Sequence, residues 1–223
     1  MCGRFTLAVN PGDFADEFGG ADFPEPFQPR YNIAPTQPVL AIPNDGKNAA
    51  TFFLWGLVPA WVKDPAIGSR LINARAETLS EKPAFRGAYK YKRCVIPADG
   101  FYEWKTQPGT KVKVPHYIRL ATHRPFALAG LWDEWHGPDG AALRTCTIIT
   151  TEPNSLMATV HNRMPVILRA EAIPDWLDGS PRAPEKLSSL LQPFPAEKME
   201  LYPVSMAVNN PANDRAECIA AAA

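Results

Sequence analysis

The chain has 223 residues, enough for one large domain or two small ones with a substantial core. Lysine plus arginine and aspartate plus glutamate both number 23, so the net charge is zero and bulk electrostatics imply no acidic partner. Any nucleic-acid surface must therefore be a local basic patch. The 24 prolines, about twice the usual share, argue against long helices and favour short strands joined by rigid loops.

Seven segments are predicted to be strands because they are short, rich in β-branched or aromatic residues and bounded by turn-forming residues. In chain order they are FTLAV (5–9), PVLAI (38–42), ATFFLWGLV (50–58), RCVIPA (93–98), HYIRLA (116–121), FALAGLWDEW (126–135) and RTCTIITT (144–151). The turn sequence GPDG (137–140) predicts that the last two strands form a hairpin.

Helical segments are fewer. They are PGDFADEFG (11–19), SLMATV (155–160), AEAIPDWLD (170–178) and PEKLSSLLQ (184–192), with a helix start predicted at Pro153-Asn154-Ser155. No repeat and no long linker divides the chain. We therefore expect one monomeric α+β domain over residues 1–223, with predominantly antiparallel sheets flanked by short helices.

The cysteines and the start of the chain indicate the cellular compartment and the redox state of the protein. Cys2, Cys94, Cys146 and Cys218 lie far apart with no Cys-x-x-Cys pair, which argues against a zinc site. The opening MCGRFTLAVNPGDF lacks the apolar core of a secretory signal, and no run of 18 apolar residues could span a membrane. We expect a cytoplasmic, disulfide-free protein without a metal, a cofactor or a membrane partner.

Four segments combine reactive or polar residues with glycine, proline or aromatic residues: MCGRF (1–5), NARAET (73–78), ADGFYEW (98–104) and TVHNRMP (159–165). Taken singly, each has a structural explanation, since a lone cysteine is often an ordinary core residue and a lone histidine is more often structural than catalytic. Glu103 is unusual because strand alternation would expose it while Tyr102 and Trp104 face inward. If these aromatic neighbours desolvate it, its pKa rises and it can donate a proton near neutrality.

Cys2 offers a chemical option that no internal cysteine has. If Met1 is removed, which a small second residue permits, Cys2 carries an α-amine and a thiol on adjacent carbons. Gly3 beside it would let another backbone approach closely.

In this order, the four segments resemble the SOS response-associated peptidase family of abasic-site processing proteins. Further segments match the family in sequence order: RYNIAPTQ (30–37), WGLVPAW (55–61), KRCVIPADGFYEW (92–104), FALAGLW (126–132), TIITTEPN (147–154) and PVSMAVN (203–209). The resemblance therefore runs nearly end to end. Asn162 departs from it, because such proteins commonly carry Asp there, and this leaves open whether an anion lies beside His161.

The resemblance implies a single domain with open, barrel-like antiparallel sheets, and a protein that bonds covalently to abasic sites in single-stranded DNA. It implies a site formed by Cys2 as nucleophile with Asn73, Glu103 and His161. It also implies that Arg4, Arg75 and Arg163 hold phosphates. Among the tryptophans, Trp61 and Trp104 are the better candidates for base stacking, and Trp55 is a weaker one.

The chemistry of an abasic site agrees with these assignments. Its opened deoxyribose is an aldehyde, which an amine attacks to give a Schiff base. A thiol two atoms from the imine nitrogen can then close a five-membered thiazolidine, an intramolecular step with a very large effective molarity. Glu103 would deliver the proton needed to expel water, His161 would open the sugar or assist reversal, and Asn73 would orient the amine or thiol.

Three other interpretations remain. Some amidotransferases also begin MCG and use the N-terminal cysteine against the amide of glutamine, although they usually carry an apolar residue where this chain has Arg4. A second alternative is a non-catalytic module that binds single-stranded DNA. A third, peptidase activity that removes Met1, can share one site with crosslinking and does not compete with it.

Overall fold

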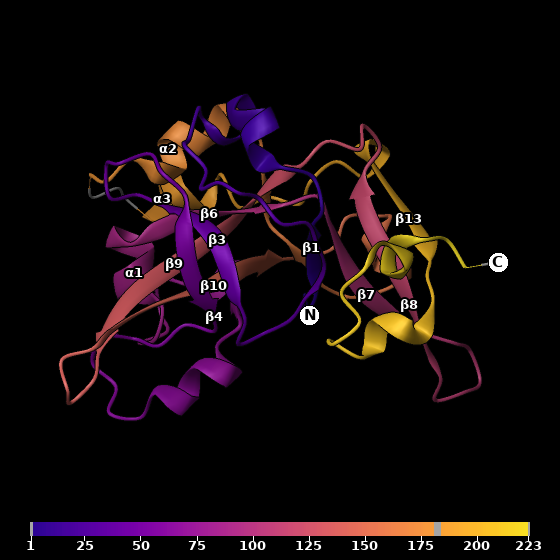
Figure 1. Ribbon diagram of the computed structural model, residues 1–223, viewed down its shortest axis with the longest axis horizontal. Helices are drawn as coiled ribbons and strands as arrows, with labels where there is room; N and C mark the ends of the chain where they lie inside the picture. The colour runs from indigo at the N-terminus through magenta and orange to yellow at the C-terminus, as the bar shows by residue number, and fades with distance from the viewer. Residues whose placement is uncertain (1, 181–183, 223) are drawn as a thin grey trace.

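The computed structural model describes residues 2–180 and 184–222. It has the predicted α+β architecture, with two β-sheets surrounded by short helices (Figure 1). The first sheet has five strands, and every neighbouring pair in it is antiparallel. Their order is β13 (Met199–Pro203), β8 (Lys113–Leu120), β7 (Gly100–Thr106), β1 (Phe5–Leu7) and β2 (Arg30–Ile33).

The second sheet closes on itself. Around the ring, each strand pairs with the next and the last pairs with the first: β10 (Ala142–Thr151), β4 (Thr51–Trp55), β3 (Pro38–Pro43), β6 (Arg93–Ala98) and β9 (Phe126–His136). Three short strands extend this barrel at its margin: β5 (Asn73–Arg75), β11 (Met164–Pro165) and β12 (Ile167–Leu168). β4 and β5 run parallel to β10, a pairing that the hairpin signals in the sequence did not predict.

All seven predicted strands are present, and β9 and β10 form the predicted hairpin. Three of them end earlier than predicted: β1, β4 and, by a single residue, β8. β1 ends at Leu7 because the next two backbone N–H groups, of Ala8 and Val9, donate to the Asp99 carboxylate at 2.6 and 2.9 Å. β4 ends at Trp55 because Gly56 has φ 132°, and a Cβ there would lie 2.6 Å from the carbonyl oxygen of Gly68.

The helices are short, as the proline content predicts. The α-helices are α1 (Arg86–Tyr91), α2 (Ile173–Leu177) and α3 (Pro184–Ser188). The 3₁₀ helices are η1 (Pro11–Phe18), η2 (Pro65–Arg70), η3 (Ala76–Thr78), η4 (Met157–Thr159), η5 (Ala170–Ala172), η6 (Ala196–Lys198), η7 (Met206–Asn209) and η8 (Ala216–Ile219). In the part of the chain that is described, no helix is both long and apolar enough to cross a membrane.

Each of the four predicted helical segments contains helix, although two of them are 3₁₀ rather than α. The helix η4 begins at Met157, slightly later than the predicted start at Pro153-Asn154-Ser155. There the Asn154 side-chain oxygen accepts a hydrogen bond from the backbone N–H of Met157 at 2.8 Å.

One hydrophobic cluster joins the two sheets. It contains Phe5, Phe101 and Ile118 from the five-stranded sheet together with Ile96 and Ile148 from the barrel. Figure 1 shows β1 between the barrel and β7, so the first described residues of the chain lie where the sheets meet. Cys2 belongs to the same cluster and is completely buried.

Candidate functional site

The segment before β1 places Cys2 in the core. β1 pairs with β7 on one side and with β2 on the other, and the backbone N–H of Tyr102 donates to the Arg4 carbonyl at 2.9 Å. The segment that carries Cys2 therefore leads directly into a strand beside the one that carries Glu103. Asp99, at the turn between β6 and β7, holds the other end of β1 through the N–H groups of Ala8 and Val9.

Asn73 contacts Cys2 directly from the barrel. It lies on β5, which pairs with β10, and its side-chain nitrogen donates to the Cys2 carbonyl at 2.8 Å. Its buried side-chain oxygen has no hydrogen-bond partner in the described part of the chain. A free amide oxygen of this kind can accept a hydrogen bond from a donor that enters the site.

Glu103 is buried, with only 2% of its surface exposed. The side chains of β7 alternate as predicted, with Tyr102 in a cluster with Tyr117 and Val208 and Glu103 on the opposite face. The expected exposure of Glu103 is wrong because both faces of β7 are covered. Burial raises the pKa of the Glu103 carboxyl, and the electrostatic interaction with His161 opposes that shift only in part. The predicted direction of the pKa shift is thus confirmed.

The Cys2 thiol is a poor acid in this environment. Burial is the main cause that raises the pKa of the thiol far above its usual value, and the negative charge of Glu103 adds to it. The sulfur is therefore protonated at neutral pH. This arrangement disfavours an attack led by a thiolate.

His161 follows η4, and its ring is held by the chain that comes after it. The backbone N–H of Arg163 donates to Nδ1 of His161 at 3.0 Å. Because Nδ1 accepts this bond, the neutral imidazole carries its proton on Nε2. Asn162, which lies between them, is exposed.

The three predicted phosphate-binding arginines have different surroundings. Arg4 donates to the Asn32 side chain and to the Val208 carbonyl, both at 2.6 Å. Arg163 forms a bidentate pair with Glu77 at 2.8 and 2.9 Å. Arg75 is exposed, and within the described residues its side chain makes no hydrogen bond or ion pair. It is the one of the three whose guanidinium is ready for a ligand.

The tryptophans also differ. Trp61 is 66% exposed and lines a groove with Gly87 and Tyr91 of α1. Trp104 is half-buried, donates from Nε1 to the Asn209 side chain at 2.8 Å, and lies under the Arg4 guanidinium at 5.9 Å from the ring centroid. Trp55 is fully buried and donates to the Ile72 carbonyl at 2.9 Å, so it is a core residue and stacks on no base.

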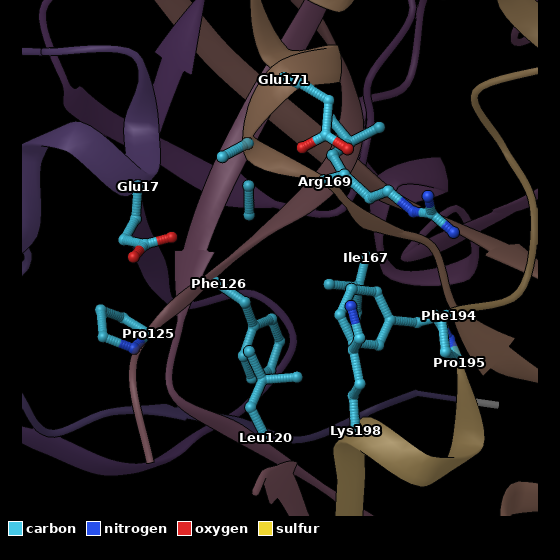
Figure 2. Close-up of a pocket in the computed structure, with 13 residues that line it drawn as sticks. Glu17, Leu120, Pro125, Phe126, Ile167, Arg169, Glu171, Phe194, Pro195 and Lys198 are labelled. Carbon is cyan, nitrogen blue, oxygen red and sulfur yellow. The ribbon is translucent and has the colours of Figure 1, made fainter. Parts of the chain in front are cut away.

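A cavity of about 210 Å³ lies elsewhere in the fold, where β8, β9, β12 and η6 meet (Figure 2). Its charged lining residues are Glu17, Arg169, Glu171 and Lys198, and none of the predicted site residues lines it. In the described ranges, no group of three or more His, Cys, Asp or Glu side chains could hold a metal ion.

Sequence reasoning missed two residues that shape the site. Asp99 fixes β1, and its signal was its position at the turn between RCVIPA and GFYEW. Glu77 pairs with Arg163, and its signal was its place in NARAET, four residues after Asn73.

Cys2 accepts a hydrogen bond from Asn73 and interacts electrostatically with Glu103, and Glu103 in turn interacts with His161. These four residues form a candidate site centred on a buried cysteine. The family model for SOS response associated peptidase (SRAP) matches residues 1–211. The chain belongs to this family.

Similar proteins extend the match over the whole length. The chain is 51% identical over 222 residues to the abasic site processing protein YoqW of Bacillus subtilis, covering 98% of this chain and 99% of that one. It is 32% identical to the abasic site processing protein HMCES of Xenopus tropicalis, covering 99% and 78%. A crystal structure of a protein from Bacteroides thetaiotaomicron matches with a TM-score of 0.88 at 28% identity and covers both chains completely.

Proposed function

We propose that this protein processes abasic sites in single-stranded DNA by bonding to them covalently through Cys2, which shields the lesion. The names of its relatives support abasic-site processing. The observation that carries the covalent mechanism is the position of Cys2, buried beside Asn73 and within reach of the Glu103 charge.

The reaction requires that Cys2 be the first residue. Met1 lies outside the described residues. Once it is removed, the Cys2 amine attacks the aldehyde carbon of the opened sugar, and one water leaves as the imine forms. The thiol then adds across the imine: sulfur bonds to the carbon, and the thiol proton goes to the nitrogen. The product is a thiazolidine.

The raised pKa of the Cys2 thiol sets the order of these steps. A protonated thiol is a weak nucleophile, so the amine attacks first. The thiol acts second, when the imine carbon is held beside it and ring closure is intramolecular.

Three side chains assist. Glu103 keeps its proton to a higher pH than an ordinary glutamate, which suits it to protonate the departing hydroxyl. His161, with its proton on Nε2, protonates the sugar ring oxygen before attack and the leaving group during reversal. Asn73 fixes the Cys2 backbone, and its free amide oxygen orients the amine.

The DNA would be held by phosphate contacts from Arg75, with Arg4 and Arg163 nearby, and by stacking on Trp61 and Trp104. The protein would act as a monomer on the unpaired strand. The family is named for peptidase activity, which in its simplest form would release Met1 at this same site.

Arg75→Ala is expected to weaken binding of abasic-free single-stranded DNA because one phosphate contact is lost. For the same reason, the slope of the logarithm of the binding constant against the logarithm of the salt concentration should become shallower by about one unit or less. Arg144→Ala is the matched control, since Arg144 is also partly exposed but pairs with Glu134 across the β9–β10 hairpin. If the two variants show equal salt slopes, Arg75 does not contact a DNA phosphate.

The function is tested by incubating the protein, without a reductant, with a single strand that contains one abasic site. We expect a band of protein joined to DNA on a denaturing gel, with none on the undamaged strand. A protein that gives no such band but hydrolyses glutamine would be an amidotransferase. Binding without any denaturation-resistant band would make it a non-catalytic binding module.

A further inference from the structure

We propose that Glu77 is a positioning residue: through Arg163, it holds the ring of His161 in one tautomer and one orientation. Only the kinetic part of this inference rests on the proposed function. The geometry itself stands on contacts among Glu77, Arg163 and the barrel.

The Arg163 guanidinium is fixed by the carboxylate of Glu77 and by Thr150, whose hydroxyl it also contacts at 3.4 Å. Nη1 and Nη2 donate to the two carboxylate oxygens of Glu77 at 2.8 and 2.9 Å, and Nη2 also donates to the Thr150 carbonyl at 2.6 Å. A bidentate arginine–carboxylate pair of this kind restricts both position and plane. The Arg163 side chain is only 13% exposed, whereas the Glu77 side chain is 43% exposed, so water reaches the pair mainly from the carboxylate side.

Both partners are anchored to the same strand. Glu77 is in η3, which directly follows β5, and β5 pairs with β10 so that Arg75 lies opposite Thr150. Arg163 directly precedes β11, which pairs with β10 on its other side. The ion pair therefore joins the segment that carries Asn73 to the segment that carries His161.

The link to His161 runs through the backbone. The Arg163 side chain fixes the position of its own N–H, and this N–H donates to Nδ1 of His161 at 3.0 Å. Loss of the pair would free the loop between η4 and β11 to shift. Nδ1 would then lose its donor, and the neutral ring would carry its proton on either nitrogen.

The charge state of Glu77 suits this role. Burial by itself would raise the pKa of its carboxyl. The hydrogen bonds from Arg163, a backbone hydrogen bond and the positive charges of Arg163 and Arg75 together outweigh this effect and leave the pKa below the usual value. Glu77 is thus ionised at neutral pH. By contrast, the Arg144–Glu134 pair is more exposed on the arginine side, joins only neighbouring strands of the hairpin and holds no site residue.

The direct test is nitrogen NMR of protein labelled in its four histidines, recorded at a pH where the rings are neutral. His161 is assigned by its loss in His161→Ala. We expect the wild type and Glu134→Gln to show the proton of His161 on Nε2, and Glu77→Gln to show an average over both nitrogens. Arg163→Lys, which keeps the charge but not the bidentate pair, should resemble Glu77→Gln. A single Nε2 tautomer in both of these variants would overturn the proposal.

A double-mutant cycle tests the consequence for the reaction. Glu77→Gln is expected to slow adduct formation and exchange about tenfold, less than the loss of a whole acid–base group. In a His161→Ala background the same change should have no further effect, because Glu77 acts through that ring. Equal slowing in both backgrounds would contradict the proposal. A wild-type protein that forms no adduct would refute the proposed function instead, and the NMR result would still decide the role of Glu77.

Discussion

Cys2→Ala is expected to abolish the stable adduct with abasic single-stranded DNA, because it removes the sulfur that closes the ring. The amine remains, so a Schiff base can still form, but it hydrolyses or leads to strand cleavage. A chain that retains Met1 should fail in the same way, since its α-amine is no longer on the residue that carries the thiol. The yield is measured on a denaturing gel after a fixed time without a reductant.

Cys146→Ala is the matched control for Cys2→Ala. Cys146 is also completely buried and burial also raises the pKa of its thiol, but it lies on β10 and has no free amine. We expect it to crosslink like the wild type. If Cys2→Ala reaches the same yield as Cys146→Ala, the thiazolidine mechanism is wrong.

Glu103→Gln is expected to slow adduct formation by roughly 10²-fold or more, because the amide keeps the shape of the side chain but cannot donate the carboxyl proton. In the wild type, the rate should fall as Glu103 loses its proton. Since burial raises the pKa of Glu103, this fall should occur at a higher pH than the 4.5 of an ordinary glutamate would give. In Glu103→Gln, the rate of adduct formation should not show this fall with rising pH.

The same substitution has a predictable effect on stability. The folded protein binds the Glu103 proton more tightly than the unfolded chain does. Its contribution to the free energy of unfolding is therefore complete at low pH and is lost as the pH rises through the folded-state pKa. Glu103→Gln removes this buried charge, so it should unfold at the same or a higher temperature than the wild type at neutral pH.

The rate measurement decides the catalytic role of Glu103. If Glu103→Gln forms the adduct as fast as the wild type, Glu103 takes no part in the chemistry.

The parts of the fold that the sequence predicted are those with strong local patterns. The β9–β10 hairpin follows from two long apolar segments around GPDG, and β6 has the predicted bounds of RCVIPA. β5, β11 and β12 have only two or three residues each, too few for alternation to be visible. Closure of the barrel rests on the parallel pairing of β4 with β10, which joins residues about ninety positions apart and has no local signal.

The candidate site also has features that the sequence predicted and features that it did not. The type and order of Cys2, Asn73, Glu103 and His161 pointed to a common site, and the structure joins them through one hydrogen bond and a chain of charge interactions. The partners of the arginines could not be predicted. Arg4 contacts a carbonyl 204 positions away and Arg163 pairs with a carboxylate 86 positions away, so only the tertiary fold shows which guanidinium is free.

Mass spectrometry of the protein after reaction with an abasic single strand tests the central claim most directly. After nuclease and protease digestion, we expect the peptide that begins at Cys2, without Met1, to carry the sugar remnant minus one water. That mass should be stable without reduction, as a thiazolidine requires. A remnant attached to a lysine, or a crosslinked peptide that still begins with Met1, would contradict the mechanism.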